Sequence, residues 1–378
     1  MRILLLAPID IGKFAGEHRP PPPYDQCPIP FPQPQAFWWK AMRDLGHQVQ
    51  VYAYVAERWP GLPLPLGLAR LATRAIPGIR NWAVPAAMYL RHSSPVLAFN
   101  QDLLATIERT SPEVLLISGG IVALQAATVA QIRRLGVRTI MLRGIPFATH
   151  PARNEIEMAE YLDLAVVNDP HHELDWRLCG CMRTLCLPIS ACDPDFHRPL
   201  PPDDTSVRNH AANVCFVGSF EPRVYYGSNR LGLLEAVADL GLAIYSSTPA
   251  PLRDSPRLMA CWRGQARQAD MPAIISAAKV SLNVLARAMP GGGNYRTFEI
   301  AGCGGFQLCD KFQDAWFTDG REIARFTTPA DLRAAVIRYL DQEDQRSAIA
   351  SAARVRAVQE HTFKHRFAIL LDALEGLS

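Results

Sequence analysis

Residues 289–310 read MPGGGNYRTFEIAGCGGFQLCD, and this stretch decides how the second half of the chain folds. Its first glycines lack Cβ atoms, so they can adopt positive φ and let a ligand approach the backbone. Thr297 is predicted to cap a short helix whose free N–H groups and dipole favour an anion in the glycine loop. Gly304 and Gly305 then end the helix, and residues 306–309 are predicted to form a buried strand.

The polar residues of this stretch suit a sugar nucleotide. Backbone amides and the guanidinium of Arg296 can bind a diphosphate, and the carboxylate of Glu299 can accept hydrogen bonds from hydroxyl groups. The alternative is a glycine-rich turn beside a salt-bridged Arg296–Glu299 pair that binds no ligand. A glycine cluster alone does not decide between them, so the order of elements around it has to.

Length and composition predict a soluble protein of two domains. The chain has 378 residues, 49% of them apolar and 20% charged, which is typical of globular proteins. A net charge of +3 is too small to indicate a nucleic acid partner. The apolar run at the amino terminus is shorter than a signal sequence and no stretch is long enough to span a membrane. We therefore expect a cytoplasmic protein.

The nine cysteines favour reduced thiols, because their number is odd and their spacing irregular. Cys179, Cys181, Cys186 and Cys192 lie close together in sequence. Their spacing matches no common zinc motif and no histidine pair accompanies them, so we predict no metal.

The first half alternates between strands and helices in the way that builds a parallel sheet. Strand 3–9 is followed by a long, proline-rich loop carrying Asp10, Gly12, Gly16 and His18. Residues 59–99, within an insertion at about 56–100, are basic and apolar, which fits either peripheral contact with the inner face of a membrane or helical packing over a sheet edge. The other predicted strands are 48–55, 114–118, 138–142, 164–168 and 184–187. The predicted helices are 36–45, 122–135, 155–161 and 171–178, together with a helix whose last residues are 104–109.

The alternation restarts after a stretch rich in proline and aspartate at 188–202. We therefore predict an α/β protein with two Rossmann-like, doubly wound domains joined by a linker. The predicted strands of the second domain are 214–217, 242–246, 280–284 and 306–309, and its predicted helices are 228–240, 271–278, 331–340, 344–361 and 363–374.

Three phrases resemble GT-B glycosyltransferases. The phrase LPISACDPDFHRP resembles the segment that joins the two halves of that fold, and VCFVGSF resembles the first strand of its donor-binding half. From about residue 214 onward, RTFEIAGCGGFQLCD and the residues after it are similar to the C-terminal module of CgeB-type and family 4 glycosyltransferases. The resemblance implies an acceptor domain at 1–190, a linker at 191–210 and a donor domain at 211–360. It also implies that the two domains face a cleft and that a C-terminal helix, 361–378, crosses back to the first domain.

The resemblance also suggests which residues bind the donor. Glu299 falls on the second carboxylate of the family's E-x7-E motif, whereas Gly291 stands where the first carboxylate would be. A basic residue after the first strand of the second domain holds the diphosphate in such enzymes, and Arg223 and Arg230 are both candidates. The predicted donor-binding residues are Gly218, Ser219, Arg223, Arg230, Gly292, Gly293, Asn294, Arg296, Thr297 and Glu299.

The chemistry expected of such a site needs no metal and no further cofactor. Guanidinium and N–H groups can stabilise the diphosphate that leaves, and no D-x-D motif lies where a metal would be held. If the reaction inverts the sugar, a base must deprotonate the acceptor, and His150, His18 and Asp10 are the candidates in the first domain. The alternative for each histidine is a loop residue bonded to backbone.

The predicted function is transfer of a sugar from a nucleotide donor to an acceptor. Two alternatives stay open, a sugar-nucleotide epimerase or hydrolase of the same fold and a non-catalytic protein that binds sugar nucleotides or carbohydrate. An NAD-dependent dehydrogenase is disfavoured, because the glycine run lacks G-x-G-x-x-G with a following acidic residue. The sequence leaves open the base and sugar of the donor, the acceptor, the stereochemistry and the oligomeric state.

Overall fold

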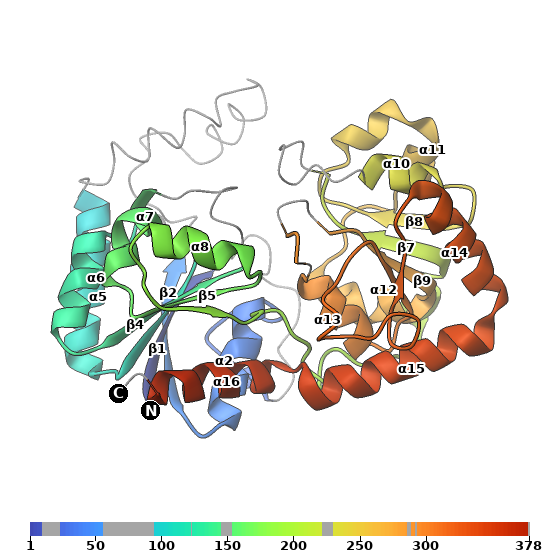
Figure 1. The fold of residues 1–378 in the computed structure, drawn as a ribbon. Helices are drawn as coiled ribbons and strands as arrows, with labels where there is room; N and C mark the ends of the chain where they lie inside the picture. The colour runs from blue at the N-terminus through green and yellow to red at the C-terminus, as the bar shows by residue number, and fades with distance from the viewer. Residues whose placement is uncertain are drawn as a thin grey trace. The chain divides into compact units, whose positions relative to one another are not determined.

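The computed structural model describes residues 1–9, 23–55, 94–121, 123–144, 153–220, 230–285, 289–291 and 293–376. They form two compact units, the first made of Met1–Val167 and His172–Cys186 and the second of Asn168–His171 and Leu187–Ser378. Each unit is built around one parallel β-sheet with helices against it (Figure 1).

The sheet of the first unit has six strands in the order β2-β1-β3-β4-β5-β6, all parallel. Every residue of β3 is buried, so both faces of the sheet are covered. The strands are β1 (Arg2–Ile9), β2 (Gln48–Val55), β3 (Val114–Ser118), β4 (Arg138–Arg143), β5 (Leu164–Val167) and β6 (Thr184–Cys186), and the helices are α2 (Pro34–Asp44), α5 (Ser94–Thr110), α6 (Ala126–Arg134), α7 (Arg153–Met158) and α8 (His171–Leu178).

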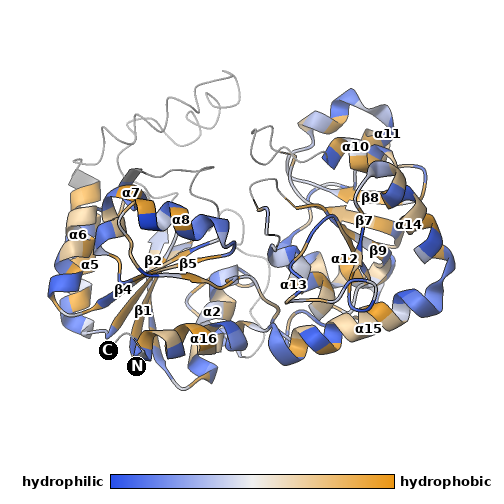
Figure 2. Ribbon diagram, in the orientation of Figure 1, coloured by the Kyte–Doolittle hydropathy of each residue, from blue (hydrophilic) through white to orange (hydrophobic). Residues whose placement is uncertain are grey.

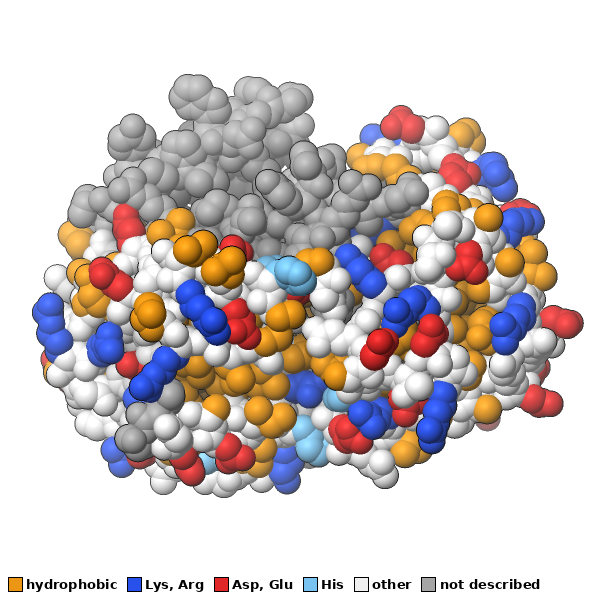
Figure 3. Space-filling view, viewed as in Figure 1, with side chains coloured by type: hydrophobic (Ala, Val, Ile, Leu, Met, Phe, Trp, Pro, Cys, Tyr) orange, Lys and Arg blue, Asp and Glu red, His pale blue; other side chains and the backbone are white. Residues whose placement is uncertain are grey.

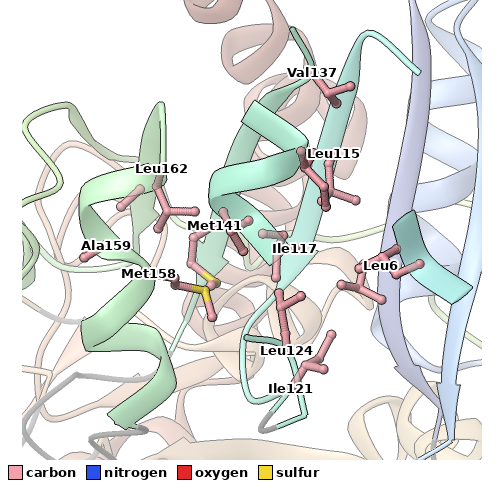
Figure 4. Packing of buried hydrophobic residues seen from close by; sticks show 14 of the residues in the cluster. Leu6, Leu115, Ile117, Ile121, Leu124, Val137, Met141, Met158, Ala159 and Leu162 are labelled. Carbon is pink, nitrogen blue, oxygen red and sulfur yellow. The ribbon is translucent and has the colours of Figure 1, made fainter. Parts of the chain in front are cut away.

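One face of this sheet packs against α5 to α8. Leu6, Leu115 and Ile117 point from the strands toward this layer, where Met141 and Met158 meet them (Figure 4). Because side chains alternate along a strand, every second residue joins this cluster, and the residues between them serve the opposite face.

The second sheet has five parallel strands in the order β11-β10-β9-β7-β8. Its strands are β7 (Ala212–Val217), β8 (Leu242–Tyr245), β9 (Ala278–Asn283), β10 (Gln307–Cys309) and β11 (Ala324–Arg325). The helices are α9 (Thr205–Arg208), α10 (Arg230–Glu235), α11 (Pro256–Cys261), α12 (Met271–Ala277), α13 (Tyr295–Gly302), α14 (Pro329–Asp341), α15 (Glu343–Glu360) and α16 (Phe363–Glu375).

The second sheet also has apolar layers on both faces. Phe216 and Leu282 pack with residues of α10, α11 and α14, whereas Cys215 and Ala243 pack with Ile274 of α12. In Figure 2 the strands at the centre of each sheet are mainly hydrophobic in colour, and hydrophilic residues gather on the outer sides of the helices. This is the doubly wound arrangement that the alternating pattern predicts, and it is confirmed.

Helix α6 is shorter than the predicted helix 122–135, because residues 123–125 are not helical. These residues are apolar enough to read as a helix, but side-chain amides bind their backbone. Asn100 donates to Ala123 O at 2.8 Å and accepts from Gln125 N at 3.0 Å. Asn154 donates to Ile121 O at 2.9 Å and to Leu124 O at 3.0 Å. The helix therefore begins only at Ala126.

Other boundaries also differ from prediction. Helix α5 begins at Ser94, inside the predicted helical insertion of about 56–100, whose bounds stay a prediction. Helix α2 begins at Pro34, since proline is tolerated in a first helical turn. Helix α10 ends at Glu235, and turns lead from it to Gly241, which has a φ of 78°. Residues 56–93 of the insertion lie outside the described part of the chain, and with them most of the predicted membrane-contact segment.

The predicted linker 191–210 lies within the second unit. Ser190, Cys192, Asp193 and His197 are buried, and Cys192 forms a β-bridge with Thr362. The helix predicted at 363–374 is present as α16. The predicted return of residues 361–378 to the first domain stays a prediction.

The face drawn in Figure 3 carries charges of both signs. Acidic and basic groups are interspersed on the described part of the face in Figure 3. The nine cysteines are free thiols. Among the described residues, no helix combines the length and the apolar character needed to cross a membrane.

A buried ion pair joins the end of β4 to α7 in the first unit. Arg143 Nη2 lies 3.1 Å from Glu155 Oε2, and both side chains are almost fully buried. Glu155 Oε1 also accepts from Gly120 N at 2.9 Å. The pair thereby ties α7 to the loop that follows β3.

We predict that Glu155→Ala lowers the free energy of unfolding by about 3–5 kcal/mol, because it leaves the Arg143 charge buried without its partner. The double variant Arg143→Met, Glu155→Leu should lose much less, since it removes both charges and keeps the volume. Urea unfolding of the three proteins measures this. A loss of under about 1 kcal/mol in Glu155→Ala would show that the pair does not hold these elements together.

Candidate functional site

The strand order of the second sheet defines where a ligand is expected. β7 connects to β8 on one side, whereas the neighbouring β9 connects to β10 on the other side. Loops that leave two adjacent strands in opposite directions open a crevice at the carboxyl edge, and open α/β sheets bind ligands there. Ser219 follows β7, Val284 follows β9 and Asp310 follows β10, so the polar groups described next lie at this edge.

Arg230 bridges the two loops at this switch point. Its Nη1 donates to Ser219 O at 2.6 Å and its Nη2 donates to Val284 O at 2.7 Å. Burial lowers the pKa of Arg230 from its ordinary value and the charge of Asp310 opposes that shift, yet a guanidinium remains a cation in either case. Of the two predicted arginines, Arg230 is thus placed at the switch point, and Arg223 lies outside the described residues.

The predicted helix cap needs a correction. Asn294, and not Thr297, is the N-cap of α13, because its Oδ1 accepts from Thr297 N at 2.9 Å. Thr297 completes a capping box by accepting from Asn294 N at 3.4 Å. An asparagine reaches the N–H three residues on as well as a threonine does, and its side chain has a second anchor.

That anchor is Asn283 at the end of β9. Asn283 Nδ2 donates to Asn294 Oδ1 at 3.2 Å, and Asn294 Nδ2 donates to Asn283 Oδ1 at 3.0 Å. Asn283 also donates to Thr297 Oγ1 at 3.0 Å and to Gln307 Oε1 at 2.8 Å. The side chains of Asn294 and Thr297 therefore fix the start of α13 on the sheet. The hydrogen bonds of both side chains are made within the protein and orient the first turn of α13.

The glycine loop is shaped by one residue that must be glycine. Gly293 has a φ of 109°, and a Cβ atom there would collide with the ring of Trp316. The backbone thus lies against an aromatic surface on one side. Gly292, the other predicted glycine, lies outside the described residues. Gly218 donates its N–H to Tyr245 O at 3.1 Å, so that group holds β7 to β8.

Glu299 and Arg296 form a pair in which the carboxylate is buried. Arg296 Nη1 donates to Glu299 Oε2 at 2.6 Å, and Gln268 Nε2 donates to Glu299 Oε1 at 2.6 Å. His197 Nε2 lies 3.6 Å from the same Oε1. The Glu299 side chain is only 4% exposed, against 20% for Arg296. Both carboxylate oxygens are thus bound by the chain itself.

The charge of Glu299 is held by its neighbours. Burial alone would raise the pKa of its carboxyl, but Arg296, His197 and Gln268 outweigh burial and lower it to about 2. A permanent carboxylate therefore lies beneath the Arg296 guanidinium. The sequence also allowed a salt-bridged Arg296–Glu299 pair, and the structure contains this pair. The binding of hydroxyls by Glu299 and of diphosphate by Arg296 stays a prediction.

Sequence reasoning missed His197 and Gln268. Both lie far from Glu299 in sequence, and His197 falls in the stretch predicted to be a linker. The His197 ring is fixed because its Nδ1 accepts from Asp193 N at 2.9 Å. The sequence signal that could have indicated a buried His197 is the DPDFH phrase, in which Asp193 and His197 are close enough to bond to each other.

The candidate bases of the first unit are not placed by the structure. Asp10, Gly12, Gly16, His18 and His150 all lie outside the described residues. The carboxyl edge of that sheet is nevertheless polar where β1 and β3 adjoin. Gln33 Nε2 donates to Pro8 O at 2.6 Å, and Gln35 Nε2 donates to Ser118 Oγ at 3.1 Å. These glutamines were not predicted.

No group of three or more metal-ligating side chains is found among the described residues. That the reaction needs no metal stays a prediction, because the metal-ligating side chains of the protein do not by themselves show how the reaction proceeds.

Comparisons with known proteins agree with this architecture. Residues 230–372 match a family model described as glycosyl transferase-like. No curated protein sequence matches the chain. A sucrose-phosphate synthase from Thermosynechococcus elongatus has 14% identity and a TM-score of 0.64, with both chains covered in full.

Two further structures are similar over nearly their whole length. A glycosyltransferase from Rickettsia africae has 10% identity and a TM-score of 0.62, covering 100% of this chain and 98% of that one. Anabaena HepE in complex with UDP and glucose has 13% identity and a TM-score of 0.60, with both chains covered in full. The chain has the GT-B fold. The family match begins at Arg230 and includes α13, so within this fold it covers most of the polar edge described above.

We predict that Glu299→Gln removes a pH-dependent part of the stability. The folded-state pKa of about 2 lies below the ordinary 4.5, so the ionised carboxylate stabilises the fold above pH 4.5. That contribution, on the order of 3 kcal/mol, is lost as the pH falls from 4.5 toward 2. Urea unfolding at pH 6 and pH 3 should show a wild-type advantage that shrinks on acidification.

The matched control is Glu343→Gln, since the Glu343 side chain is 79% exposed and lies 3.8 Å from its arginine partner. Its stability difference from wild type should stay within about 0.5 kcal/mol at both pH values. Equal pH dependence in wild type and Glu299→Gln would contradict the assignment.

Proposed function

We propose that the protein is a glycosyltransferase that moves a hexosyl or related group from a nucleoside-diphosphate donor to an acceptor hydroxyl. One observation carries the proposal. The family match over 230–372 starts at the arginine that bridges the switch point and contains Glu299 and the helix whose N-terminus faces the glycine loop. The finer likeness to CgeB-type and family 4 enzymes belongs to the same proposal.

The donor is a sugar nucleotide, with UDP as the first nucleotide to test. HepE is described in complex with UDP and with UDP-glucose. In this chain, the cationic groups of Arg230 and Arg296 and the N-terminus of α13 are the groups suited to a diphosphate. As the glycosidic bond breaks, negative charge grows on the leaving diphosphate, and these groups stabilise it without a metal.

The buried carboxylate of Glu299 has a separate task in this proposal. It holds the Arg296 guanidinium at the start of α13, so that the cation is fixed in place before the donor arrives. Preorganised charge costs no reorganisation when the reaction occurs, which is why such pairs assist catalysis. The first unit supplies the acceptor site, with His150, His18 or Asp10 as base if the reaction inverts the sugar.

The direct test incubates the protein with UDP-, GDP- and dTDP-sugars and measures nucleotide release. We expect release from at least one donor, increased by a cell extract that contains the acceptor and unchanged by EDTA. Release without acceptor and without a transferred product would favour a hydrolase, and isomerised donor would favour an epimerase. Binding without release would favour a non-catalytic protein, and neither binding nor release would overturn the proposal.

A second prediction concerns Arg230. Arg230→Met should weaken UDP binding by roughly 10- to 100-fold, the usual cost of one charged hydrogen-bond donor. Arg333→Met is the control, because Arg333 lies on α14 and pairs with Asp239 through exposed side chains. Isothermal titration calorimetry gives both affinities. Equal affinities in the two variants would remove Arg230 from the donor site.

A further inference from the structure

A buried carboxylate contacts the glycine loop from a distant part of the sequence. Asp169 belongs to the short segment Asn168–His171 of the second unit, and its side chain is fully buried. Its Oδ2 accepts from Gly291 N at 2.6 Å, across 122 positions of the chain. Neither the glycine loop nor the family resemblance predicts a role for this residue.

Asp169 is also held on its other side. Its Oδ1 accepts from His171 N at 3.0 Å and lies 2.8 Å from His171 Nδ1. The carboxylate thus receives two backbone N–H groups and one imidazole contact. These contacts fix the orientation of the carboxylate group, with Oδ2 directed at the glycine loop.

The Asp169 carboxylate lies where a side chain at position 291 would point if that residue were not glycine. A Cβ atom placed on Gly291 would lie 3.0 Å from Asp169 Oδ2 and 3.1 Å from Asp169 Cγ. The carboxyl group therefore occupies the space into which a side chain at position 291 would project. The carboxyl carbon of a glutamate lies two bonds beyond its Cβ, so a glutamate at 291 would place its carboxylate in nearly the same volume.

We propose that Asp169 supplies, from a separate segment, the carboxylate that position 291 lacks, and that it positions the glycine loop for the nucleotide diphosphate. This rests on the proposed function. Gly291 opens the loop that passes Trp316 at Gly293 and enters α13 at Asn294. Fixing its N–H fixes the course of that loop. Asp169 is a positioning residue, because it acts through the backbone N–H of Gly291.

The decisive experiment exchanges the two positions. Gly291→Glu alone directs a second carboxylate into the space that Asp169 occupies, and two like charges side by side cannot both ionise freely. Asp169→Gly alone leaves the Gly291 N–H without its acceptor. Each single variant should weaken nucleotide binding about 10-fold or more, the equivalent of one charged hydrogen bond. The double variant Asp169→Gly, Gly291→Glu should recover binding to within about 3-fold of wild type, because it restores one carboxylate in one place.

The readouts separate positioning from general stability. The isosteric Asp169→Asn should raise the Kd for UDP and the KM for the donor, while its thermal midpoint stays close to that of Asp341→Asn, an exposed control at the end of α14. Should a single variant fail to fold, recovery of both folding and binding in the double variant still supports the exchange. Failure of the double variant to exceed the weaker single variant overturns it.

The outcomes also distinguish this inference from the function it rests on. Calorimetry with UDP, GDP and dTDP is first carried out on the wild-type protein. If none of them binds and no donor is turned over, the proposed function and the inference both fall. If one binds and Asp169→Asn binds it equally well, the inference alone is overturned and the glycosyltransferase proposal stands.

Discussion

A buried charge has to be compensated, and the second unit is arranged around this constraint at Glu299. Its carboxylate lies inside the protein, where ionisation without partners would cost several kcal/mol. Arg296 comes from the same helix, Gln268 from the segment before α12, and His197 from the stretch that enters the unit. Three separate parts of the chain thus meet at the two carboxylate oxygens of Glu299. The predicted linker thereby contributes a partner to this carboxylate and belongs to the second unit.

The two sheets share a strand order, and in each the switch point is bridged by side chains. In the second unit, Arg230 links the loops after β7 and β9. In the first unit, Gln33 reaches β1 and Gln35 reaches the end of β3. Parallel strands expose their last carbonyls at the carboxyl edge, so donors from a following helix satisfy them there. Among the described residues, a cation bridges the switch point of the second unit, where it suits an anionic ligand, and neutral amides lie at that of the first unit.

The sequence predicted the strands of both sheets closely, because most of the parallel strands are apolar runs between turn residues, but it missed the two-residue strand β11. It was less accurate where side chains bind the backbone. Residues 123–125 were predicted to be helical, but Asn100 and Asn154 bind their carbonyls and an amide. The cap of α13 was assigned to Thr297, whereas Asn294 has the additional support of Asn283. In both cases the deciding partner lies on another element, and local pattern carries no information about it.

For the candidate site, the sequence predicted the glycine loop, the cation and carboxylate of α13, and an arginine after the first strand of the second unit. These follow from residue types at short spacing, which local geometry fixes. Only the tertiary structure decided that Glu299 is enclosed by His197 and Gln268, and that Arg230 bridges two loops. It also placed Asp169 against Gly291, where a side chain is missing. Contacts between segments far apart in sequence depend on how the sheet brings its carboxyl ends together, and no spacing along the chain encodes that.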